Sequence, residues 1–166
     1  MRIKLFILLL IAIFIQGCSY SFTGASVPPH LKTIAILPFN DRSSSGEPNL
    51  QTDLMNELIQ KFIDDNSLQL TDKKNADALL EGTIKSLRSS PIAVTAGESV
   101  NTVRVKIIVD VTYRDLVKKE KIFEKSFNNY GDYENSGDIT TARSDAIVSA
   151  IDNITEDILL AVVANW

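Results

Sequence analysis

Residues 103–114 alternate apolar and polar side chains with a strict period of two. Side chains of a β-strand point alternately to its two faces, so this period predicts a strand with one buried and one solvated face. A turn at 117–120 and a second segment from Ile122 to Tyr130 follow, which predicts an antiparallel hairpin. The apolar side chains of the first segment are Val103, Val105, Ile107, Val109, Val111 and Tyr113.

Two other segments repeat apolar residues at helical spacing, which predicts amphipathic helices. In the first, Pro48 is expected in the first turn and Asp64 to Asn66 end the helix. The second is a long helix near the C-terminus. The repeated residues are Leu50, Leu54, Leu58 and Phe62 in the first helix, and Ile147, Ile151, Ile154, Ile158 and Val162 in the second.

Shorter apolar runs predict further strands. Residues 33–39 are interpreted as a buried, central strand followed by a polar loop at 40–49, and Leu68 and Leu70 alternate as a short strand. Residues 76–87 predict another strand, whereas 89–101 and the Gly/Asp/Asn-rich stretch 128–138 are expected to be loops. Two helices can cover one face of such a sheet. The predicted fold is therefore α+β, a two-layer sandwich with a four- to five-stranded mixed sheet and two helices on one face.

The N-terminus has the pattern of a bacterial lipoprotein signal. Positive charge at Arg2 and Lys4 precedes an apolar run from Leu5 to Ile15, which is shorter than the roughly 20 residues that span a bilayer. Gly17 and Cys18 follow, and Cys18 is the only cysteine of the chain. We therefore expect residues 1–17 to be cleaved, 18–31 to form the lipidated N-terminus and tether, and 32–166 to form a single domain.

Composition and residue types narrow the possible functions. Loss of Arg2 and Lys4 with the signal leaves 15 basic and 21 acidic residues, a net charge of −6, which does not favour nucleic acid as a partner. The one histidine, His30, falls in the tether and is interpreted as a solvated linker residue. Without a second histidine, a spare thiol or a Gly-rich phosphate loop, the sequence predicts no enzyme, no metal site and no cofactor.

A set of motifs in a fixed order spans essentially the whole mature chain. They are the lipobox, Tyr20-Ser21-Phe22, the segments 33–43 (TIAILPFNDRS) and 76–84 (ADALLEGTI), the alternating hairpin, and a C-terminal helix ending at Trp166. Together they resemble the LPS-assembly lipoprotein family, LptE.

The resemblance implies a domain of two helices and four strands that plugs the β-barrel of the outer-membrane lipopolysaccharide (LPS) translocon, an LptD-like protein. It implies that this domain helps the barrel assemble and engages LPS as it arrives. Ser19, which follows the lipidated cysteine, matches the sorting habit of outer-membrane lipoproteins. We therefore expect a chain held in the outer membrane by its N-terminal acyl chains, with its domain on the periplasmic side or inside a barrel.

Within this resemblance, a local excess of positive charge is a candidate ligand site. The four cations are on or beside the solvated face of two adjacent predicted strands, where Arg and Lys side chains could bind the phosphates of LPS. Strand faces also carry Lys and Arg for solubility and to discourage edge pairing, so this second interpretation stays open. The candidate residues are Lys85, Arg88, Arg104 and Lys106.

Two other classes of function remain alternatives. Residues 34–39 followed by Asn40-Asp41 also resemble the first strand of LpoB-like and CsgG-like periplasmic lipoproteins, which activate a peptidoglycan synthase or take part in secretion. The third class is a lipid-anchored hydrolase. Co-purification would distinguish a large outer-membrane barrel from a penicillin-binding synthase, and turnover of a substrate would indicate the hydrolase.

Overall fold

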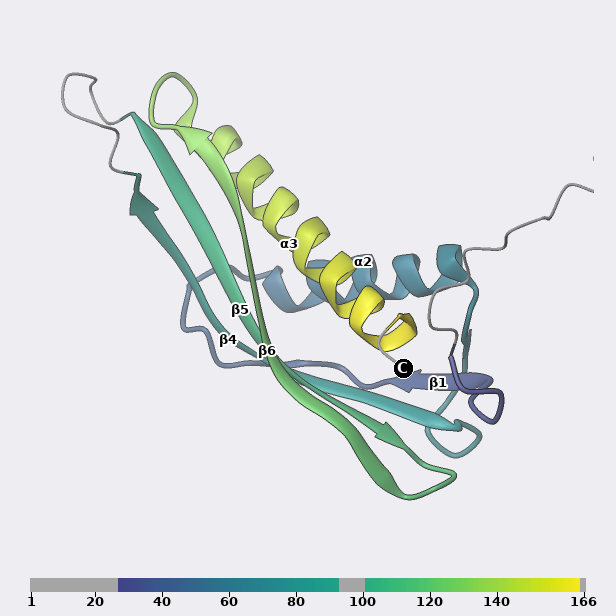
Figure 1. Cartoon of the computed structure of the whole chain (residues 1–166). Coiled ribbons are helices and arrows are strands. Elements are labelled where there is room, and N and C mark those ends of the chain that lie inside the picture. The colour runs from purple at the N-terminus through teal and green to yellow at the C-terminus, as the bar shows by residue number, and fades with distance from the viewer. Residues whose placement is uncertain (1–26, 93–100, 165–166) are drawn as a thin grey trace, which may run out of the picture.

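The long hairpin predicted from the alternating segment forms one side of the sheet (Figure 1). The computed structural model describes residues 27–92 and 101–164. In it, β5 (Thr102–Asp115) and β6 (Glu120–Glu134) pair antiparallel along their length, which confirms the hairpin. Five of the six alternating side chains of β5, from Val105 to Tyr113, are at most 1% exposed. Strand β6 continues to Glu134, so the prediction of a loop from residue 128 onward is wrong for the first half of that stretch.

The remaining strands complete a mixed sheet in the order β3-β1-β4-β5-β6. Strand β4 lies next to β5 and runs antiparallel to it, whereas β1 runs parallel to both of its neighbours, β3 and β4. A two-residue strand, β2, also pairs with β4. These strands are β1 (Thr33–Ile36), β2 (Asn40–Asp41), β3 (Gln69–Leu70) and β4 (Ala78–Pro91).

The first strand is shorter than the apolar run that predicted it. Strand β1 ends at Ile36, two residues before Pro38, which has no backbone N–H to continue the ladder. Phe39 still belongs to the core and is fully buried, because Gly82 on β4 leaves room for its ring. A Cβ atom at Gly82 would lie 2.6 Å from Cε2 of Phe39. The apolar run at 33–39 thus consists of a short strand and, beyond it, the core side chain of Phe39.

Both helices lie on the same side of the sheet (Figure 1). Helix α2 (Leu50–Asp65) follows the N-cap Asn49, so Pro48 precedes the helix and does not lie in its first turn as predicted. Helix α3 (Ile139–Val163) runs along β6. All nine apolar residues that predicted the two helices are buried, at 9% exposure or less. The predicted two-layer α+β fold with two helices on one face is confirmed.

Helix α3 approaches β6 unusually closely at one glycine. A Cβ atom at Gly131 would lie 2.0 Å from the backbone oxygen of Ala146, so any side chain there would collide with the helix backbone. The two helices and the inner face of the sheet enclose a single apolar core. Across residues 27–92 and 101–164, neither α2 nor α3 is both long and apolar enough to span a membrane.

Candidate functional site

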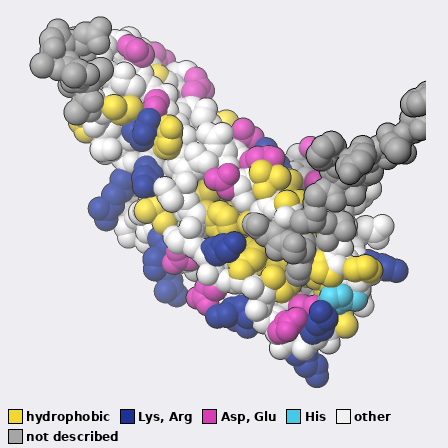
Figure 2. Space-filling model, in the orientation of Figure 1, with side chains coloured by type: hydrophobic (Ala, Val, Ile, Leu, Met, Phe, Trp, Pro, Cys, Tyr) yellow, Lys and Arg dark blue, Asp and Glu magenta, His cyan; other side chains and the backbone are white. Residues whose placement is uncertain are grey.

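The sheet face turned away from the helices carries the four candidate cations. Lys85 and Arg88 lie on β4, and Arg104 and Lys106 lie on β5, where they alternate with the buried valines and isoleucines. A β-bulge between Ile84 and Ser86 shifts the register of β4 and brings Arg88 directly opposite Lys106. Figure 2 shows Lys and Arg side chains gathered along the side of the sheet that faces away from α3. The structure therefore brings the four candidates onto one surface, which we call the open face.

Two of these cations are engaged by carboxylates of the protein itself. The guanidinium of Arg104 donates two hydrogen bonds of 2.7 Å to the two carboxylate oxygens of Asp132. Its Cζ atom lies 3.5 Å from the centroid of the Tyr130 ring, and the hydrogen bond to Asp132 is the main reason why the pKa of Arg104 is raised. Nζ of Lys85 lies 3.7 Å from Oδ2 of Asp110, in a more exposed pair. Arg104 is thus held in place by Asp132 on β6. The sequence analysis missed this partner because it predicted a loop at 128–138.

The other two cations have no such partner among the residues that the structure describes. Within the described ranges, the side chains of Arg88 and Lys106 form no hydrogen bond or ion pair, and both are exposed. They lie opposite each other on neighbouring strands, and like charges in this position destabilise a sheet slightly. An anion bound between them would relieve this repulsion. Arg88 and Lys106 are therefore the strongest candidates on the open face for binding a phosphate group.

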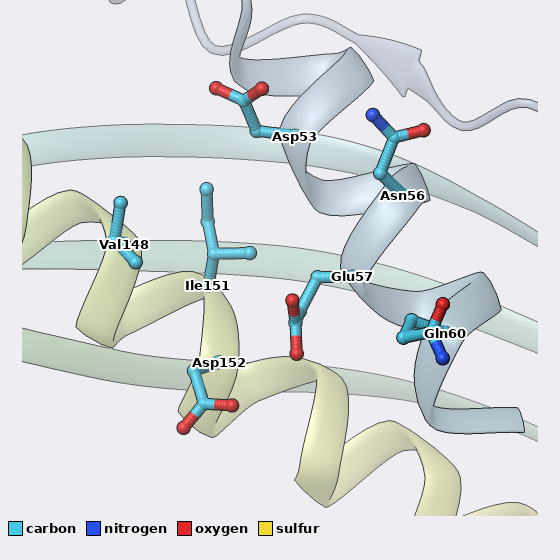
Figure 3. Close-up of a pocket in the computed structure, with 7 residues that line it drawn as sticks. All are labelled: Asp53, Asn56, Glu57, Gln60, Val148, Ile151 and Asp152. Carbon is cyan, nitrogen blue, oxygen red and sulfur yellow. The ribbon is translucent and has the colours of Figure 1, made fainter. Parts of the chain in front are cut away.

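The helix layer has the opposite charge. A groove of about 530 Å³ lies between α2 and α3, with Asp53 and Glu57 on one side and Asp152 on the other (Figure 3). Val148, which is 61% exposed, lines the same groove. Lys61 closes salt bridges across the helix pair, with its Nζ 2.8 Å from Asp152 and 3.2 Å from Glu156. The hydrogen bond to Asp152 is the largest cause of the raised pKa of Lys61. The acidic groove thus lies on the side of the sheet opposite the four candidate cations.

His30 does not match its interpretation as a solvated linker residue. Its Nε2 lies 2.6 Å from Oδ2 of Asp115, at the end of β5, and its side chain is 30% exposed. Asp115 is only 2% exposed and also accepts a hydrogen bond from the backbone N–H of Lys118. The next residue, Leu31, is buried in the core. The last residues of the predicted tether therefore belong to the packed domain. Sequence patterns do not reveal the contact between His30 and Asp115, because it forms only when the chain folds.

The Asp115 carboxylate makes stability depend on pH. Burial alone would raise its pKa, but hydrogen bonds from the Lys118 N–H and from His30 hold the pKa below its ordinary value of 3.8. A carboxyl group with a lowered pKa in the folded state stabilises the fold above its unfolded pKa, and this contribution disappears as pH falls through the folded pKa. We expect Asp115→Asn to lower the free energy of unfolding by about 1–3 kcal/mol at pH 7.

The difference from the wild type should shrink steadily below pH 4 in urea denaturation experiments. Asp65→Asn, at an exposed position of α2, is the matched control and should show little difference at any pH. A loss of stability in Asp115→Asn that stays the same from pH 7 to pH 3 would contradict this description of the buried carboxylate.

Cys18, the signal segment 1–17 and most of the tether lie outside the described residues. Residues 27–92 and 101–164 contain no group of three or more His, Cys, Asp or Glu side chains placed to hold a metal ion.

Comparison with known proteins gives one family. The sequence model of the family described as LptE, lipopolysaccharide-assembly, matches residues 31–162. This range begins at the buried Leu31, includes every strand of the sheet, and reaches the last turn of α3. No curated protein matches the chain in sequence.

Solved structures with low sequence identity share the fold. A hypothetical protein from Chlamydia trachomatis aligns with a TM-score of 0.61 and 13% identity, over 80% of this chain and 95% of its own length. A minor lipoprotein from Acinetobacter baumannii gives 0.53 and 15%, over 81% and 94%. Rare lipoprotein B from Shewanella oneidensis gives 0.51 and 14%, over 76% and 92%. At such identities the similarity concerns the fold alone.

Proposed function

The chain belongs to the LptE family of lipopolysaccharide-assembly proteins, and on that premise we propose that it plugs the β-barrel of the outer-membrane LPS translocon. In this role it assists LPS insertion at the outer membrane and makes or breaks no covalent bond. The observation that carries the proposal is the extent of the family match. It covers residues 31–162, and therefore both helices almost completely and all strands.

The proposed partners are an LptD-like barrel, LPS and the membrane itself. We propose that residues 1–17 are removed on export and that acyl chains on Cys18 hold the mature chain in the outer membrane. Two or more acyl chains bind a bilayer almost irreversibly, whereas a single chain gives only marginal, reversible binding. The folded domain is then free to lie on the periplasmic side or inside the barrel.

Within this role, we propose that the open face meets the phosphates of LPS. Arg88 and Lys106 supply the direct contacts, because their charges have no partner among the described residues. Arg104, fixed by Asp132 and stacked on Tyr130, and Lys85, beside Asp110, extend the positive surface on either side. Arg binds phosphate through directed, charge-assisted hydrogen bonds and Lys acts as a point charge, so both contributions weaken as salt rises.

The pair Arg88→Glu/Lys106→Glu tests this assignment. Loss of two charge-assisted contacts is expected to weaken binding of purified LPS to the mature chain by about tenfold or more at low salt, and by less at moderate salt. The double variant should stay folded, because both side chains are exposed. The matched control is Lys73→Glu/Lys125→Glu, which changes the net charge equally at two exposed positions away from the open face. Equal affinity of the two double variants would mean that the open face does not bind LPS phosphates.

A further inference from the structure

We propose that the end of the domain where β1 and β4 begin rests on the anionic headgroups of the membrane that holds the lipid anchor. This inference depends on the proposed anchoring at Cys18, and it does not depend on contact with LPS. It concerns a surface separate from the open face. We call this surface the basic end and define it by five exposed lysines: Lys32, Lys73, Lys74, Lys118 and Lys119.

Backbone contacts bring three separate parts of the chain together at the basic end. The backbone N–H of Lys32 donates a hydrogen bond of 2.9 Å to Oδ2 of Asp77, at the start of β4. The backbone N–H of Leu116 donates one of 2.8 Å to the carbonyl oxygen of Asp77. The turn 71–75, the β5–β6 turn and the beginning of β1 are therefore neighbours. Figure 2 shows Lys or Arg side chains near the histidine, which is His30, together with acidic side chains at this end.

The carboxylates beside these lysines are largely occupied by the protein itself. Asp77 accepts further hydrogen bonds from the N–H and the hydroxyl of Thr33, and Asp72 accepts them from backbone N–H groups of its own turn. Asp115 is buried against His30. Glu120 is the exception, since it lies 3.9 Å from Nζ of Lys118 in an exposed pair. Asp72, Asp77 and Asp115 thus accept hydrogen bonds within the protein, whereas the five lysines are exposed.

The short distance between the basic end and the proposed lipid anchor indicates that the membrane is what this surface contacts. Val27, the first described residue, is nine residues after Cys18 in the sequence, and an extended chain of that length reaches at most about 30 Å. His30 and Leu31 fix the point where the chain joins the domain, at the basic end. The lipid anchor therefore keeps this end close to the bilayer. Each Lys near an anionic surface strengthens partitioning by about fivefold, an effect that falls off within a Debye length of about 8–10 Å.

Vesicle binding tests the inference. The chain from residue 18 onward, carrying Cys18→Ala and thus no acyl group, would be cosedimented with vesicles of phosphatidylcholine alone or mixed with phosphatidylglycerol. We expect binding to the mixed vesicles at low salt, little binding to phosphatidylcholine, and release at high salt. Lys73→Glu/Lys74→Glu/Lys119→Glu should weaken partitioning to the mixed vesicles by about 100-fold or more.

A second triple variant, Lys85→Glu/Arg88→Glu/Lys106→Glu, gives the same change of net charge on the open face and should keep most of the vesicle binding. Absence of binding to anionic vesicles at low salt, or an equal loss in both triple variants, would overturn the inference. LPS binding by the same proteins separates this failure from failure of the proposed function, because it depends on Arg88 and Lys106. The intact mass of the chain purified from membranes tests acylation of Cys18 independently.

Discussion

Ile154→Asp is expected to leave the domain unfolded at room temperature. Ile154 lies on α3, is fully buried, and belongs to the core that joins both helices to the sheet. The substitution removes its packing, which by itself costs about 2–5 kcal/mol, and it also places an unpaired carboxylate in an apolar environment. The combined cost approaches or exceeds the total stability of about 5–15 kcal/mol that is typical of a domain.

Circular dichroism and thermal denaturation measure this effect. The matched control is Val148→Asp, the same new side chain on the same helix at a position that is 61% exposed, and it should melt close to the wild type. A cooperative transition of Ile154→Asp near that of Val148→Asp would show that this side of α3 does not pack against the sheet.

Gly131→Ala is expected to destabilise the domain by about 3 kcal/mol or more, although it adds only a methyl group. The new Cβ atom would lie 2.0 Å from the oxygen and 2.8 Å from the carbonyl carbon of Ala146. Both are backbone atoms of α3, so no change of side-chain rotamer can relieve the collision. Helix α3 would have to move away from β6, which opens gaps in the core along the whole contact.

Denaturation in guanidinium chloride measures the loss of stability, with Ser126→Ala as the control on an exposed position of the same strand. The midpoint of Gly131→Ala should fall well below that of the control. Equal midpoints would contradict the close approach of α3 and β6. Any loss of function in this variant should match its loss of folded protein, since Gly131 itself is buried under the helix.

The parts of the fold that were predictable from the sequence are those in which burial repeats with a fixed period. The alternation along β5 and the four-residue spacing along α2 predicted both the elements and their buried faces, because each element buries a single face. The same alternation along β5 placed Arg104 and Lys106 together on the open face. Lys85 and Arg88 are three residues apart, so alternation alone would put them on opposite faces of β4, and the β-bulge between Ile84 and Ser86 brings both to the open face.

Features that depend on contacts between distant segments were not predictable in this way. Gly131 looked like a loop residue, but it is required in a strand because α3 crosses it. His30 looked like a linker residue, because its partner Asp115 is 85 residues away. The salt bridge between Arg104 and Asp132 likewise depends on the extension of β6 beyond Tyr130. The sequence contains a weak signal for this salt bridge, since Asp132 falls opposite Arg104 when the predicted hairpin is extended.

The central claim, that this LptE-family chain plugs the LPS translocon, is tested most directly by purifying the acylated, affinity-tagged protein from outer membranes in mild detergent. The account predicts a stable complex with one large LptD-like β-barrel that survives high salt, in which the folded domain resists protease while the same domain alone is cleaved. Recovery of the folded, acylated protein with a penicillin-binding synthase, or with no barrel at all, would contradict it.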